Sequence, residues 1–133
     1  MSEFFELFDM RPVTAEGFDQ ALVDAGEALV VVYFWGDACF NCDQFKKAAT
    51  IRADDIRALG LHWLQADVYA DSGLRRRFAL HGVPTFYVFH RGRKIGRITS
   101  WPGIAAFTEA MRKQLKQIRD NVSQDASLTL PAT

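Results

Sequence analysis

Two cysteines, Cys39 and Cys42, are the residues of this chain best suited to carry chemistry, and only two residues separate them. A disulfide between them would close a very small loop, which gives little stabilisation through the unfolded state. In a chain with no secretory features, cysteines at this spacing suggest redox chemistry or metal ligation rather than a structural cross-link. A structural zinc site normally needs four nitrogen or sulfur ligands, and His62, His81 and His90 are scattered without a ligand spacing. Redox chemistry is therefore the favoured interpretation.

The pair lies where a buried strand passes through a turn into a helix. Residues 29–35 form an unbroken apolar run, which is typical of a central strand covered on both faces, and Gly36 and Asp37 favour a turn after it. The start of a helix carries unpaired N–H groups and a partial positive charge, which favour a thiolate over a thiol. We therefore predict that Cys39 is the attacking thiol. Cys42, about one turn later, is expected to resolve the mixed disulfide.

Helical and strand patterns alternate along the rest of the chain. The helix that carries the cysteines is expected to be a single long one that continues to Leu59, with Gly60 as the residue after its end. Beside that helix and the strand before it, we expect a helix over residues 14–25, a strand over 61–67, a short helix from 71, strands over 85–89 and 93–99, and a helix from 104 to about 118. Alternation in the first part implies parallel crossovers, and the hairpin near the end adds antiparallel strands. The expected fold is α/β, a three-layer α/β/α sandwich with a mixed central sheet. Whether residues 4–8 form an edge strand or a helical turn stays open.

Length and composition indicate one soluble domain. The chain has 133 residues, 49% of them hydrophobic and 24% charged, which is enough to bury a core. We expect a single domain over residues 1–120 and a flexible polar tail over 121–133, which breaks the helical pattern before it. The formal charge is zero, so charge supplies no pull toward nucleic acid or membrane. The basic runs 75–77 and 91–94 are interpreted as solvated faces, with a docking surface as the alternative.

Neither a secretory signal nor an apolar run of about 18 residues is found in the sequence. We therefore expect a soluble, cytoplasmic protein with no nucleic-acid or membrane partner. A monomer is also expected.

Two segments resemble the thioredoxin-like family. Residues 34–42, Phe-Trp-Gly-Asp-Ala-Cys-Phe-Asn-Cys, resemble the strand, tryptophan and CxxC segment of that family. Residues 82–86, Gly-Val-Pro-Thr-Phe, resemble the segment that holds a cis-proline before the third core strand. The final hairpin and helix follow in the family's order, and the likeness covers roughly Thr14 to Ile118. The resemblance implies a thioredoxin-fold thiol–disulfide oxidoreductase that has a redox-active disulfide, no bound cofactor and no metal.

The resemblance also implies roles for residues around the cysteines. The peptide bond between Val83 and Pro84 would be cis and would pack beside the cysteine pair. The exposed backbone of Val83 would pair with an extended substrate segment. Trp35, Phe40 and Trp101 would complete an apolar patch that holds the incoming disulfide in line. Trp35 could equally belong to the core, whereas Trp101 stands in a loop where burial is less easily achieved.

The chain departs from the family pattern at several supporting positions. A buried acid usually stands six residues before the first cysteine, and here the residue is Tyr33; a lysine expected on the next strand is replaced by Gln65. Phe40 and Asn41 separate the cysteines in place of Gly-Pro, and Asp43 rather than a basic residue follows them. Loss of the acid should slow deprotonation of the resolving thiol, unless Tyr33 or a water substitutes. Asp43 should disfavour a nearby thiolate, although it suits the first turn of a helix.

These observations lead to one leading function and two alternatives. The leading one is a protein-disulfide oxidoreductase that serves electron transport and cell redox homeostasis, as a reductase if the compartment is cytosolic. Its partners would be protein disulfide substrates and a thioredoxin-reductase-like or small-thiol electron donor. The first alternative is a thioredoxin-fold binding or assembly module with regulatory or idle cysteines, which Tyr33 and Asp43 keep open. In the second, two chains would pool their cysteines around a zinc ion or an iron–sulfur cluster.

Overall fold

The computed structural model describes residues 2–129, with side chains for residues 3–122. Its elements follow one another as α1 (Ser2–Leu7), β1 (Arg11–Pro12), α2 (Phe18–Asp24), β2 (Val30–Trp35), α3 (Phe40–Ile51), α4 (Ala53–Ala58), β3 (His62–Asp67), α5 (Ser72–Arg77), β4 (Thr85–His90), β5 (Arg93–Thr99) and α6 (Ile104–Thr129). Each helix and strand expected from the sequence has a counterpart within a few residues of its expected bounds, except that the helix after the cysteines is divided into α3 and α4 and that α6 ends later.

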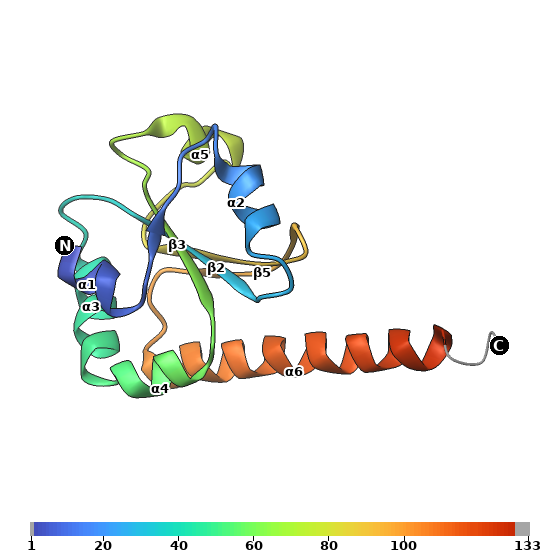
Figure 1. Ribbon diagram of the computed structural model, residues 1–133. Coiled ribbons are helices and arrows are strands. Elements are labelled where there is room, and N and C mark those ends of the chain that lie inside the picture. Colours follow the sequence, from blue (N-terminus) through green and yellow to red (C-terminus); the bar gives the residue numbers. More distant parts are fainter. Residues whose placement is uncertain (1, 130–133) are drawn as a thin grey trace.

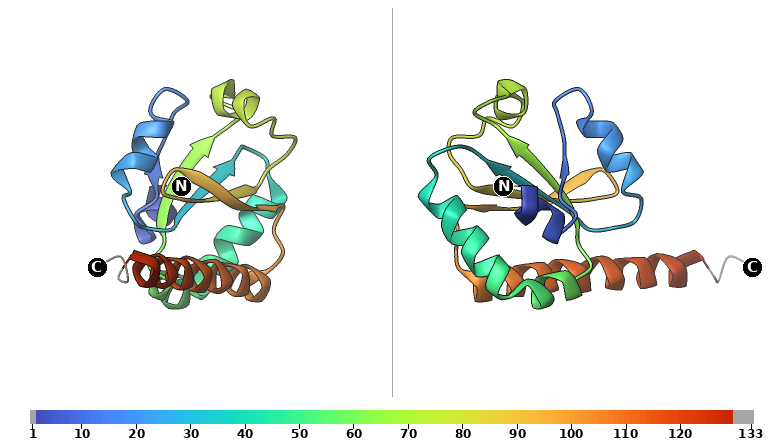
Figure 2. Two further views of the ribbon diagram at one scale, coloured as in Figure 1. Left: turned by 90° about the vertical axis from the view of Figure 1, so that its right-hand side faces the viewer. Right: turned by 60° about the vertical axis from the view of Figure 1, so that its left-hand side comes forward.

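The five strands form one mixed sheet in the order β1-β3-β2-β4-β5. Strand β3 pairs in parallel with both β1 and β2, whereas β4 runs antiparallel to β2 and to β5. Helices α3, α4 and α6 cover one face of the sheet, and α2 and α5 cover the other (Figures 1 and 2). The expected three-layer α/β/α sandwich with a mixed sheet is therefore confirmed.

Strand β2 lies in the middle of the sheet, between β3 and β4, and nearly every one of its side chains is buried. Val31 and Tyr33 face the α3 and α6 side, whereas Val32 and Phe34 face the α2 and α5 side, as the two-residue period of a strand requires. A run without a polar residue can occupy only a strand that helices cover on both faces. The chain leaves β2 directly beneath the start of α3, so this strand sets the position of the cysteines.

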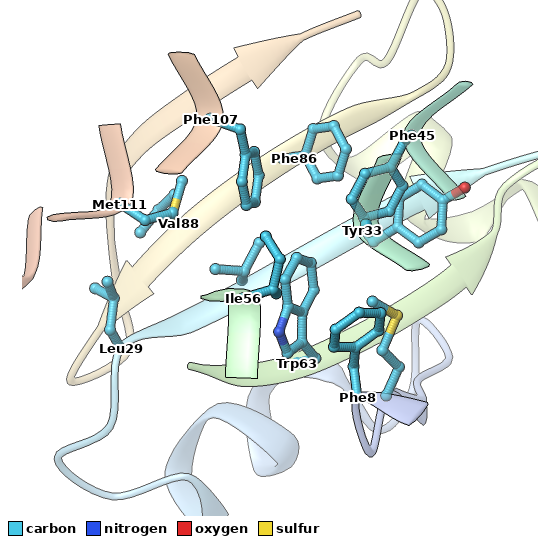
Figure 3. Packing of buried hydrophobic residues seen from close by; sticks show 13 residues of the cluster. Phe8, Leu29, Tyr33, Phe45, Ile56, Trp63, Phe86, Val88, Phe107 and Met111 are labelled. Carbon is cyan, nitrogen blue, oxygen red and sulfur yellow. The ribbon is translucent and has the colours of Figure 1, made fainter. Parts of the chain in front are cut away.

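Aromatic rings hold α3 against the sheet. Phe45, one turn after the cysteine pair, lies with its ring centroid 4.8 Å from that of Tyr33 and 4.9 Å from that of Phe86 (Figure 3). Phe107 of α6 lies 5.3 Å from Phe86 and closes the cluster from the other helix. Edge-on ring pairs of this kind contribute about 0.5–1.5 kcal/mol each beyond the area they bury. The first turns of α3 therefore pack against a dense cluster of aromatic side chains.

Three local features differ from the sequence-based expectation. The two-residue strand β1 was not predicted, whereas residues 4–8, left open between an edge strand and a helical turn, lie mostly in the helix α1. The single long helix expected after the cysteines is divided at Arg52, whose backbone (φ −107°, ψ 33°) is not helical. Helix α6 continues through residues 121–129, so the break expected at residue 121 is wrong. Residues 130–133 lie outside the described part of the chain, and the flexibility of the tail stays a prediction. No helix between residues 2 and 129 is both long and apolar enough to cross a membrane.

Candidate active site

The two cysteines form a disulfide at the start of α3. Their Cα atoms lie 5.2 Å apart. Cys39 is the N-cap residue, with an extended backbone that follows Ala38 in the left-handed region (φ 55°). Cys39 is partly exposed, whereas Cys42 is buried with 2% of its surface accessible. An incoming group can therefore reach the sulfur of Cys39, and that of Cys42 faces the interior. Within the described residues, no three histidine, cysteine or acidic side chains gather as metal ligands do.

The start of α3 supplies a hydrogen bond to the accessible sulfur. The backbone N–H of Cys42 donates to Sγ of Cys39 over 3.1 Å, so Cys39 caps the helix as serine or aspartate commonly does. A donor at this position, together with the helix dipole, stabilises a thiolate on Cys39 once the disulfide is reduced. Asp43 works against that charge, but its carboxylate is exposed and pairs with Lys46 at 3.3 Å. The N–H of Cys42 and the helix dipole therefore act directly on the sulfur, whereas the charge of Asp43 is screened by solvent and by Lys46.

The Pro84 loop is tied to the start of α3 through Ser100. The peptide bond between Val83 and Pro84 is cis. The N–H of Ser100 donates to the carbonyl oxygen of Pro84 over 2.8 Å, and Nδ2 of Asn41 donates to Oγ of Ser100 over 3.1 Å. Ser100 adopts a left-handed backbone (φ 64°), which turns the chain out of β5 toward the cysteines. Three segments that are distant in sequence thus meet at the disulfide, and no sequence pattern had singled out Ser100.

The predicted apolar patch is only partly exposed. Phe40, between the cysteines, has 73% of its surface accessible. Trp35 is half-buried, and its Nε1 donates to Oε1 of the buried Gln65 over 2.7 Å. Trp101 is also half-buried, because it folds back until its ring lies 5.0 Å from that of Phe45. The sequence predicted that this loop residue is less easily buried, and Trp101 keeps part of its surface accessible. Val83 is half-buried and packs against the α2 and α5 side of the core.

A second exposed aromatic side chain, Tyr69, lies beside the turn that leads to the cysteines. Tyr69 is 55% exposed, and its ring covers Gly36 so closely that a Cβ atom there would overlap it. Oδ1 of Asp67 accepts the N–H of Tyr69 at 3.1 Å and that of Ala70 at 3.0 Å, which fixes the turn after β3. Nothing in the local sequence indicates this contact, because β2 and β3 must first be aligned in the sheet.

Tyr33 occupies the interior beneath α3. Its side chain is fully buried, and among the described residues its hydroxyl has no hydrogen-bond partner. Burial raises the pKa of Tyr33 well above its ordinary value of 10.0, and the negative charge of Asp43 raises it further. The phenol therefore stays neutral near pH 7. It can donate a hydrogen bond, but it cannot accept a proton as an ionised acid would.

Comparison with known proteins relates the whole arrangement to one family. Residues 9–117 match the family model described as Thioredoxin. Over 114 residues the chain is 32% identical to the thiol:disulfide interchange protein DsbD of Cronobacter sakazakii, a match that covers 80% of this chain and 20% of that protein. The chain thus spans about a fifth of the length of this curated relative.

Solved structures agree on the fold. Thioredoxin of Fasciola hepatica superposes with a TM-score of 0.67 at 19% identity, over 78% of this chain and 98% of the other. The reduced thioredoxin pre-protein of Schistosoma mansoni gives 0.66 at 20% identity, over 78% and 96% of the two chains. At these identities the likeness shows the fold alone.

Proposed function

Because the chain belongs to the thioredoxin family of thiol–disulfide oxidoreductases, we propose that it reduces disulfide bonds in protein substrates through Cys39 and Cys42. The observation that supports this most directly is the placement of the cysteine disulfide at the N-terminus of α3, with Cys39 accessible and Cys42 buried. The hydrogen bonds that Ser100 forms with Pro84 and with Asn41, which stands between the cysteines, also support the proposal.

The proposed reaction has two exchange steps. In the reduced protein, the thiolate of Cys39 attacks one sulfur of the substrate disulfide, a mixed disulfide forms, and the first substrate thiolate leaves. The sulfur of Cys42 then attacks that of Cys39, the second substrate thiolate leaves, and the intramolecular disulfide forms. The substrate gains two electrons from the cysteine pair, and its two thiolates take up protons. Because Tyr33 stays neutral, we propose that the proton of the Cys42 thiol passes to water or to the departing thiolate rather than to a buried base.

Substrate is proposed to dock as an extended segment along Val83. Among the described residues, neither the N–H nor the carbonyl of Val83 takes part in a hydrogen bond, so both are free to pair with a strand from a partner. The exposed ring of Phe40, which stands between the two cysteines in the sequence, offers apolar contact. We propose that a thioredoxin-reductase-like protein or a small thiol returns the electrons. The cytoplasmic location and monomeric state also remain proposals.

A turnover assay tests the proposal. The wild-type protein should accelerate reduction of a protein disulfide by excess dithiol, Cys39→Ser should abolish the acceleration, and Cys42→Ser should accumulate a mixed disulfide with the substrate. Equal rates for the wild-type protein and Cys39→Ser would refute it. The direction of electron flow follows from equilibrium with glutathione, since a potential near about −270 mV suits a reductase and one near about −120 mV an oxidant.

The neutral phenol of Tyr33 in place of an acid favours one second candidate, a binding module whose cysteines are idle. That function predicts that Cys42→Ser traps no substrate, and that a partner is still captured after both thiols are alkylated.

A further inference from the structure

A groove continues the site along the edge strand β5. Its volume is about 350 Å³, and it lies between residues 79–84 on one side and Arg97, Thr99 and Ser100 of the β5 side on the other. Ser100 belongs both to the groove and to the tie with Asn41 at the start of α3. An extended segment that reaches the disulfide along Val83 would therefore pass into this groove.

The groove carries one permanent charge, which is that of Arg97. Its lining contains neither aspartate nor glutamate. Arg97 is exposed and pairs with Tyr87 across β4 and β5, so that its side chain emerges on the groove face together with that of Thr99. Within the described residues, no carboxylate forms an ion pair with Arg97, whereas Arg77 and Arg91 are paired with Asp19 and Glu27. An arginine held on an edge strand beside apolar walls, without an acid of its own, is available to a carboxylate of a partner.

The distance between Arg97 and Ser100 predicts how far that carboxylate lies from the reacting cysteine in the partner's sequence. Arg97 precedes Ser100 by three residues along β5, which corresponds to about 10 Å at the rise of a strand. An extended segment that runs parallel to β5 covers this distance in about three residues. The long side chains of arginine and glutamate can bridge part of the distance between the two backbones. A carboxylate two or three residues from the reacting cysteine can therefore meet Arg97.

We propose that Arg97 selects protein disulfides in which an acidic side chain lies two or three residues from the reacting cysteine. This rests on the proposed function, because it presumes that substrate docks along Val83. A solvent-exposed charge pair typically contributes about 0.2–1 kcal/mol, which corresponds to a preference of up to about fivefold in kcat/KM. The preference should shrink as salt is added, since exposed charges are screened.

The test uses peptide disulfides of one sequence, with glutamate, glutamine or lysine placed two and three residues before or after the reacting cysteine. For the wild-type protein at low salt, kcat/KM should fall in the order glutamate, glutamine, lysine on one side of the cysteine. Arg97→Gln should remove the preference, and Arg97→Glu should reverse it. Arg93→Gln is the matched control, because Arg93 is an exposed cation on the same strand but lies outside the groove; it should keep the wild-type preference. Thermal unfolding verifies that all variants are folded.

The outcomes separate the two proposals. Equal kcat/KM for the three peptides at both sides, or an unchanged preference in Arg97→Gln, overturns the role of Arg97 while reduction of peptides by Cys39 stands. An effect of Arg97→Gln that is confined to oxidised glutathione, with the peptides unaffected, also overturns it, because the proposed ligand is a protein segment. Absence of any Cys39-dependent turnover with every peptide overturns the proposed function and the role of Arg97 with it.

Discussion

Replacing Tyr33 with phenylalanine should make the oxidised protein more stable. The phenol ring lies 4.8 Å from that of Phe45 and 5.4 Å from that of Phe86, and phenylalanine keeps both contacts. What the substitution removes is a hydroxyl that is fully buried and has no partner among the described residues. An unsatisfied buried polar group costs about 1–3 kcal/mol. We therefore expect a gain of about 1 kcal/mol or more, which corresponds to roughly 4 °C in Tm for a domain of this size.

The neighbouring strand offers a matched control. Tyr87 is also a buried residue, but its hydroxyl donates to the carbonyl of Phe78 over 3.4 Å. Tyr87→Phe should therefore lower the free energy of unfolding by about 0.5–1 kcal/mol, because it leaves that carbonyl without its donor. Urea unfolding of both variants and the wild-type protein, under oxidising conditions, measures the two changes. A loss of stability in Tyr33→Phe equal to that in Tyr87→Phe would show that the hydroxyl of Tyr33 has a partner, and the reasoning would fail.

Three further predictions concern pH and packing. Because burial raises the pKa of Tyr33, the native state keeps this proton where the unfolded chain loses it; the wild-type protein should therefore lose stability relative to Tyr33→Phe between about pH 9 and about pH 11, and urea unfolding at the two values checks this. Burial, and then the charge of Arg11, lowers the pKa of His62 below its ordinary 6.5, so stability should be lost as the pH falls below 6.5. His62→Gln should reduce that loss of stability. If the free energy of unfolding falls equally with pH in His62→Gln and in the wild-type protein, the prediction is contradicted. Gly36→Ala should cost about 1–3 kcal/mol, because the new methyl group overlaps Tyr69, and most of that cost should vanish in the background of Tyr69→Ala when a double-mutant cycle is measured by urea unfolding.

Much of the fold could be predicted because its strongest signals are local. The apolar, β-branched run that became β2 favours a buried strand, and Asp71 caps α5 by accepting the N–H of Gly73 over 3.0 Å. Gly60 adopts the left-handed backbone (φ 68°) expected after a helix. The division at Arg52 could not be foreseen, since neither glycine nor proline marks it. Helix α6 outlasts its apolar period because polar residues extend an existing helix at little cost.

The site was predictable where it depends on motifs and unpredictable where it depends on alignment across the sheet. The cysteine pair and Pro84 are recognisable from neighbouring residues. The contact of Tyr69 with Gly36 exists only once β2 and β3 are in register. The partial burial of Trp101 likewise depends on left-handed backbone at Ser100 (φ 64°) and Gly103 (φ 101°), which folds the loop back onto the core. A left-handed backbone is uncommon for serine, so the sequence around Ser100 does not indicate it.

The tie made by Ser100 has a consequence for what the protein can accept. Because Ser100 forms hydrogen bonds with both Pro84 and Asn41, the Pro84 loop and the start of α3 are held in place before a ligand arrives. They need not close around it. The ordering entropy of complex formation then falls on the partner. A disulfide in a loose or unfolded stretch can straighten to fit, whereas one locked inside a native core would first have to unravel. We therefore expect turnover to rise steeply when a compact substrate is partially denatured.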